Sequence, residues 1–132
     1  MEAKLRKRTV MGQYIMAEFD GTNYSGITVL DDRVLIEPDR AAPVVGGLHI
    51  IPEKQEQITA AAETGVIVGV GEEAFKFNSD RSRMWIDGYK PKPGDRVIFD
   101  RYAGSVVRGE DHRMDRVMDD KVVAGRSGPA PA

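Results

Sequence analysis

The chain has 132 residues, of which 41% are hydrophobic and 30% are charged, with a net charge of −2 and no cysteine. This length and balance suggest one folded, soluble domain, and the slight acidic surplus argues against a general nucleic-acid binder. Without cysteine, neither a disulfide nor a thiolate metal site can form, and the cytoplasm is the simplest location.

The first 26 residues differ in composition from the rest of the chain. They contain the basic cluster Lys4, Arg6, Lys7 and Arg8 and end in the turn-forming stretch FDGTNYSG. The cluster could contact a phosphate backbone, although a solvated tail is the simpler interpretation. The early apolar stretch is too short and broken for a signal peptide, and no run approaches the roughly 20 apolar residues that span a membrane. We expect residues 1–26 to form a partly ordered extension.

Two segments in the first half of the chain are predicted to be strands. In ITVLDDRVLIEP (27–38), β-branched and aliphatic residues nearly alternate with polar ones, and in TGVIVGVGEE (64–73) glycines stand where a barrel strand would bend. Between them, DRAAPVVGG (39–47) is typical of a loop. The segment EKQEQITAAAE (53–63) contains good helix formers, but its apolar spacing is weak, so we predict a loop that leads into the next strand.

Residues 71–91 predict a hairpin that leaves the barrel. Two short β-prone pieces, Phe75–Phe77 and Met84–Ile86, flank a turn at Asn78–Asp80. Trp85 and Tyr89 in this segment could form a stacking platform, but packing within the hairpin is the simpler interpretation.

The C-terminal third predicts further short strands. DRVIFDRY (95–102) and SVVRG (105–109) are separated by a turn, and HRMDRVMDDKVVA (112–124) predicts a strand, a turn at Asp119-Asp120 and a last strand at Val122–Ala124. Residues 126–132 form a flexible tail. The chain is thus predicted to be all-β, with five to seven short strands that form a small β-barrel.

The sequence shows no catalytic or metal-binding pattern. His49 and His112 are far apart in the sequence, whereas a metal site needs three or four convergent ligands. The acidic pairs Asp31-Asp32 and Asp119-Asp120 are adjacent residues, which point to opposite faces of a strand, so neither pair makes an acid/base couple by itself. The glycines of GVIVGVGEE do not match a dinucleotide-binding loop. We therefore predict a non-enzymatic protein with no metal and no cofactor.

Five motifs in one order resemble the GroES-type co-chaperonin (chaperonin-10) family. The family pattern has a strand with an L-x-D-R-V core, a Gly-Gly loop with an aliphatic tripeptide, a G-x-V-x-x-V-G strand, a K-x-G-D-x-V-x-F strand followed by a Tyr-Gly turn, and a last strand near D-I-x-A. The matching segments are LDDRVLIEP (30–38), GGLHIIPEK (46–54), TGVIVGVGEE (64–73), KPGDRVIFDRYAG (92–104) and DDKVVA (119–124). The resemblance covers residues 27–125.

The chain departs from the family pattern at four places. Val29 stands where a proline is common, the 26-residue extension is not typical, and the excursion at 71–91 is longer than usual. After Ala124 the usual aliphatic ending is replaced by Gly125 and Arg126. The family pairs the N- and C-terminal strands of neighbouring subunits, so this last change bears on the ring contact. Such divergence would suit a member encoded by a virus or phage, which would act in the host cytoplasm.

The resemblance implies a GroES-like β-barrel that assembles as a homoheptamer and caps a GroEL-type chaperonin. A mobile loop at 40–62 would dock on the chaperonin's apical domains, and a roof hairpin at 71–91 would cover the central opening. Within the tripeptide Leu48-His49-Ile50, the outer two residues would be the anchors, since in an extended chain they project to one side. The residues expected at the docking site are Gly46, Gly47, Leu48, His49, Ile50 and Ile51.

Two residues of this assignment leave alternatives open. His49 stands at a usually apolar position, where it would weaken docking, tune it with pH or simply face solvent, the interpretation we favour. Tyr102 matches a family tyrosine that faces the folding chamber, but it could equally pack in the barrel.

The expected partners are the chaperonin, other copies of this chain and an unfolded client protein in the chamber. The chaperonin would bind and hydrolyse ATP, and neither nucleic acid nor a membrane is expected to bind. The alternative function is a monomeric β-barrel adaptor or nucleic-acid-binding module, because the N-terminus is basic and the excursion is aromatic.

Overall fold

The computed structural model describes residues 10–75 and 91–126. Several predictions fall on segments outside these ranges and are not tested: the basic cluster at Lys4–Arg8, the pieces of the excursion within 76–90 with Trp85 and Tyr89, and residues 127–132 of the tail predicted at 126–132. None of the helices in the described ranges is long and apolar enough to cross a membrane.

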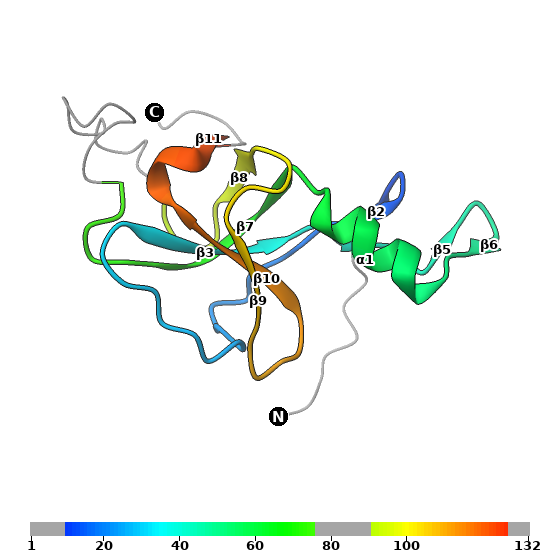
Figure 1. The fold of residues 1–132 in the computed structure, drawn as a ribbon, viewed down its shortest axis with the longest axis horizontal. Helices are drawn as coiled ribbons and strands as arrows, with labels where there is room; N and C mark the ends of the chain where they lie inside the picture. Colours follow the sequence, from blue (N-terminus) through cyan, green and yellow to red (C-terminus); the bar gives the residue numbers. More distant parts are fainter. Residues whose placement is uncertain (1–9, 76–90, 127–132) are drawn as a thin grey trace.

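The fold is all-β with one short helix, which confirms the predicted class (Figure 1). Six antiparallel strands form the main sheet in the order β11-β8-β7-β3-β10-β9. The strands of this sheet are β3 (Arg33–Pro38), β7 (Thr64–Val70), β8 (Arg96–Phe99), β9 (Ser105–Arg108), β10 (Met114–Asp119) and β11 (Val123–Arg126).

Each of these six strands lies within or next to a segment predicted to be extended. The predicted turn at Asp119-Asp120 is a 3-10 helix, η1 (Asp120–Val122), and β11 then runs through Arg126. Gly125 and Arg126, which replace the aliphatic ending, therefore continue the last strand, which was predicted to end at Ala124, and Arg126 belongs to β11 rather than to the predicted tail at 126–132. Arg126 Nε donates a hydrogen bond to Asp95 Oδ2 at 3.1 Å, which holds the end of β11 beside β8.

The hydrophobic core lies on one face of the curved sheet. Its buried side chains come from β3, β7, β8, β10, β11 and the turn after β7: Val34, Ile36, Ile67, Ala74, Phe75, Val97, Phe99, Met118 and Val123. Leu35 points to the other face of β3 and is also fully buried. Consequently β3 is covered on both faces, as its run of aliphatic residues allows.

Part of the N-terminal extension supplies that second cover. A Cβ atom built on Gly69 would lie 3.6 Å from Leu35 Cβ and 3.8 Å from the Asn23 side chain. Glu110 donates its backbone N–H to Ser25 O at 2.8 Å, and Gly109 is close enough to Ser25 that a Cβ atom would clash with its backbone. Residues 23–25 thus contact both the main sheet and the turn after β9.

A smaller sheet and a hairpin complete the described fold. The strands β1 (Val10–Met11), β2 (Tyr14–Ile15) and β4 (Arg40–Ala41) form a three-stranded sheet in that order, and β5 (Val44–Val45) pairs with β6 (Leu48–His49). Both lie with the helix α1 (Pro52–Ala60) at one end of the main sheet (Figure 1).

Candidate functional site

The segment 40–62 is built of regular elements in this structure. It begins with β4, continues through the hairpin β5–β6 and ends with α1. In Figure 1 the hairpin lies beyond α1 and farthest from the main sheet. The segment therefore presents its middle part, residues 44–51, away from the body of the protein.

The hairpin turn explains the Gly-Gly pair. Gly46 and Gly47 have φ values of 57° and 83°, and two successive positive φ angles are the requirement of a type I′ turn between two strands. Val44 pairs with His49 and Val45 with Leu48 on either side of the turn. Ile50 extends the pairing, because its N–H donates to Pro43 O at 2.8 Å.

The hairpin exposes apolar side chains to solvent. Leu48 is 72% exposed, Ile51 is 63% exposed and Val44 is 41% exposed. Ile50, expected with Leu48 as an anchor, is half-buried in this structure, and His49 is exposed. The exposed large apolar side chains of residues 44–51 are therefore Val44, Leu48 and Ile51. Val44 and Leu48 project from opposite faces of the hairpin, because Val44 pairs with His49 and Leu48 pairs with Val45.

The prediction of a loop at 53–63 is wrong, because residues 52–60 form the helix α1. Pro52 occupies the start of the helix, where its fixed φ is favourable and its missing N–H is not needed. Only Ile58 and Thr59 are buried, which is why the apolar periodicity was too weak to predict a helix. The usable signal was the proline followed by a run of helix formers.

The two ends of segment 40–62 are joined at its base. Ala41 of β4 donates its backbone N–H to Thr59 Oγ1 at 2.9 Å, and both residues are buried. At the other side of α1, Arg108 of β9 forms an ion pair with Glu56 at 3.2 Å, but both side chains are at least half exposed. Exposed pairs contribute little, so the buried contacts at the base hold α1.

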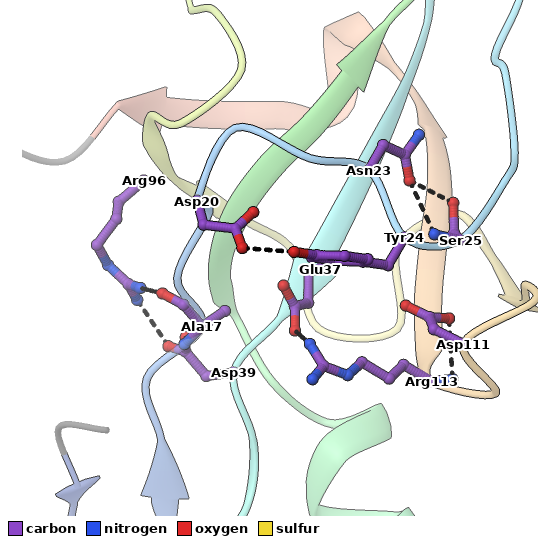
Figure 2. Close-up of polar contacts among 10 residues, drawn as sticks. All are labelled: Ala17, Asp20, Asn23, Tyr24, Ser25, Glu37, Asp39, Arg96, Asp111 and Arg113. Carbon is purple, nitrogen blue, oxygen red and sulfur yellow. Dashed lines mark hydrogen bonds and ion pairs between the residues drawn. The ribbon is translucent and has the colours of Figure 1, made fainter. Parts of the chain in front are cut away.

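Asp39 is the polar centre next to this base. Its Oδ1 accepts the N–H of Ala17 at 2.8 Å, and its Oδ2 accepts a charged hydrogen bond from Arg96 at 2.7 Å (Figure 2). Arg96 also donates to Ala17 O at 3.1 Å. The Asp39 side chain is 3% exposed and that of Arg96 is 26% exposed, so this pair is largely shielded from solvent and joins the three segments.

A groove of about 320 Å³ separates α1 from the turn between β9 and β10. Arg40, Arg108, His112 and Arg113 are among its lining residues. Arg113 donates to Glu37 Oε1 at 2.8 Å (Figure 2). Beside this pair, burial raises the pKa of Asp115 to about 7, with a further contribution from the nearby carboxylates of Asp111 and Glu37, while Arg113 opposes the rise.

Tyr102 lies at the turn between β8 and β9 and is 65% exposed. Its φ of 63° is in the left-handed region, which non-glycine residues rarely adopt. The turn is closed by Ala103 N–H, which donates to Asp100 O at 3.0 Å. The tyrosine ring is thus held out toward solvent by a tight turn.

The structure brings together three of the acidic residues that the sequence places in separate pairs. Because β3 begins where β10 ends, oxygens of Asp32, Asp119 and Asp120 all lie within 4.8 Å of one another. Arg33 forms ion pairs with Asp119 at 3.0 Å and Asp32 at 3.6 Å, and Asp120 Oδ2 accepts the N–H of Phe75 at 2.8 Å. These contacts give the cluster a structural role in joining β3, β10 and the turn after β7.

Comparison with known proteins identifies the family of this chain. The family model described as "Chaperonin 10 Kd subunit" matches residues 26–125. The chain belongs to the chaperonin-10 family. The match begins at Gly26, so residues 1–25 lie outside it. The hairpin, α1 and the six strands of the main sheet lie inside it, except for Arg126 at the end of β11.

Curated relatives agree with this membership. The chain is 39% identical over 82 residues to the co-chaperonin GroES of Latilactobacillus sakei, which covers 61% of this chain and 78% of that protein. It is 34% identical over 85 residues to the co-chaperonin GroES of Treponema denticola, covering 63% and 80%. With co-chaperonin GroES 1 of Rhodopirellula baltica it shares 25% identity over 95 residues, covering 72% and 86%.

Proposed function

We propose that this chaperonin-10 family member is a co-chaperonin that caps a GroEL-type chaperonin and assists ATP-dependent protein folding. The observation that carries the proposal is the β5–β6 hairpin, which exposes Leu48 within the matched family region, with the exposed Ile51 next to it at the start of α1. The chaperonin would bind and hydrolyse the ATP, and this chain would act in the cytoplasm with it.

Docking would occur when the hairpin places its apolar side chains in a groove on the chaperonin's apical domain. Burial of one Leu or Ile side chain contributes roughly 1.5–3 kcal/mol. Ordering a flexible segment would cost about 1–2 kcal/mol per residue, and a hairpin that is already paired reduces this cost. One arm would still bind weakly, because only a few apolar side chains are available.

Assembly as a heptamer would convert weak arms into a stable cap. Several identical arms on one ring gain avidity without new contacts, and a weak single arm also lets the cap dissociate. The position of β11 is consistent with this ring. Its outer side has no neighbour among the described strands, and the family pairs terminal strands of adjacent subunits. In such a ring, Tyr102 would face the client protein in the chamber.

The test is co-sedimentation with a chaperonin in the presence of ATP, using the Leu48→Ser variant. We expect the variant to lose binding while analytical ultracentrifugation still shows a heptamer. Val106→Ser is the matched control, because Val106 is 52% exposed on β9, outside the hairpin, and should bind normally. Unchanged binding of Leu48→Ser would refute docking through the hairpin, and a monomer with salt-sensitive nucleic-acid binding would support the alternative function.

A further inference from the structure

The N-terminal segment ahead of the family match is attached to the base of segment 40–62. Its strand β2 pairs with β4, with Tyr14 opposite Ala41 and Ile15 opposite Arg40. Ala42 adds a backbone hydrogen bond by donating its N–H to Gln13 O at 2.8 Å. The first residues of segment 40–62 are therefore part of a sheet that the extension completes.

The same strand also reaches the far end of the segment. The Tyr14 hydroxyl donates to Ile58 O in the last turn of α1 at 3.3 Å, across 44 positions of the sequence. Ile58 is 7% exposed and Ala42 is 4% exposed. One strand of the extension thus contacts both the chain that enters the hairpin and the helix that leaves it.

A second set of contacts fixes this strand to the main sheet. Ala17, only two residues after β2, is 5% exposed and bonded through its N–H to Asp39 and through its carbonyl to Arg96 of β8 (Figure 2). The Arg96–Asp39 pair at 2.7 Å is largely shielded, and charged hydrogen bonds of this kind are among the stronger ones. The strand cannot shift without breaking these bonds.

We infer that residues 10–17 form a clamp that orders the base of segment 40–62 and thereby strengthens docking of the hairpin. The affinity part of this inference rests on the proposed function. A flexible base would lose conformational freedom when the hairpin docks, and this loss would oppose binding. With the clamp in place, the base has already lost that freedom on folding, so each arm binds more tightly.

Two deletions separate the clamp from the rest of the extension. Removal of residues 2–9 leaves β1 and β2 intact, whereas removal of residues 2–16 deletes both strands. By hydrogen exchange we expect the amides of Ala41, Ala42 and Ala61 to exchange about tenfold faster or more in the longer deletion only. We also expect the longer deletion to weaken chaperonin binding roughly ten- to hundredfold, with the ring state checked by ultracentrifugation.

Two point variants test the clamp in a chain that keeps its fold. Tyr14→Phe removes only the hydroxyl that bonds Ile58 O and should weaken chaperonin binding roughly two- to tenfold. The control is Tyr24→Phe, which removes the 2.7 Å bond to Asp20 within the same extension and should leave binding unchanged.

The outcomes distinguish the clamp from the proposed function. Unchanged exchange at the base after deletion of residues 2–16 overturns the clamp, whatever the chaperonin does. Faster exchange with unchanged affinity overturns its effect on docking. If the full-length chain binds no chaperonin, the proposed function and the affinity part both fail, and exchange alone decides whether residues 10–17 order the base.

Discussion

Asp115 is a carboxylic acid placed where its charge is unfavourable. It is 2% exposed, and burial raises its pKa to about 7, above the usual value of 3.8. In the unfolded chain the group ionises near pH 4, but the folded protein retains the proton until about pH 7. Its contribution to stability is therefore complete below pH 4, decreases between pH 4 and 7, and is lost above pH 7.

The variant Asp115→Asn should remove this dependence. The difference in free energy of unfolding between the variant and the wild type should be more favourable to the variant at pH 8 than at pH 5, by about 1–4 kcal/mol. One unit of pKa corresponds to about 1.4 kcal/mol. Denaturant unfolding at the two pH values measures the difference. Asp111→Asn, a half-buried neighbour, is the comparison and should give a smaller change. A difference at Asp115 that does not depend on pH would contradict the assignment.

Arg116 shows what residue-level patterns cannot predict. It stands in a strand that the sequence predicted, yet it is 2% exposed, with its guanidinium 4.8 Å from the Phe99 ring centroid. It donates to Ala103 O at 2.9 Å and to Ala62 O at 3.0 Å, and burial lowers its pKa. Both acceptors are backbone carbonyls distant in sequence, so no motif around Arg116 indicates that its charge is buried.

At the scale of elements, substitutions in the hairpin turn test whether a closed hairpin is needed for docking. Gly46 and Gly47 have positive φ, and a Cβ atom built on either would meet nothing within 4 Å. Substitution there changes backbone preference without a clash. Gly47→Val should open the hairpin, at a cost of about 1–2 kcal/mol, and weaken docking roughly five- to thirtyfold.

Gly46→Asn is the matched variant, since Asn-Gly is a favoured type I′ sequence, and should bind as well as the wild type. Exchange of the Ile50 amide, which bonds Pro43 O, reports whether the hairpin is closed. Equal affinity of the two variants would show that the closed hairpin is not the docking form.

The elements that the sequence predicted share one property, a strong local pattern. The strands β3 and β7 are rich in aliphatic and β-branched residues and end at turn formers. Both also lie in motifs that follow the order of the chaperonin-10 family pattern. The helix α1 lacks such a pattern, because it contacts β4 along a narrow face and buries only Ile58 and Thr59. Its existence depends on packing at the base of the hairpin, which local propensity does not contain.

At the scale of the whole molecule, the extension could not be placed from its composition. Its described part contacts β4, α1, β8 and the turn after β9. These partners lie 22 to 85 positions away in the sequence, as the Ala17–Asp39 and Ser25–Glu110 bonds illustrate. The candidate docking residues were predictable because a motif carries them, whereas the clamp behind them has no motif.

The proposed ring makes docking a property of all arms together, which mixed rings can test. Co-refolding wild-type chains with Leu48→Ser chains in increasing proportion yields rings with fewer intact arms. Because each lost arm removes an intramolecular binding event, a ring with half its arms should bind more than about tenfold more weakly. Chaperonin binding should therefore fall faster than the fraction of wild-type chains in the mixture. Mixtures with Val106→Ser chains should bind normally. A loss that is simply proportional to the wild-type fraction would mean that each protomer binds alone, and would contradict a multivalent cap.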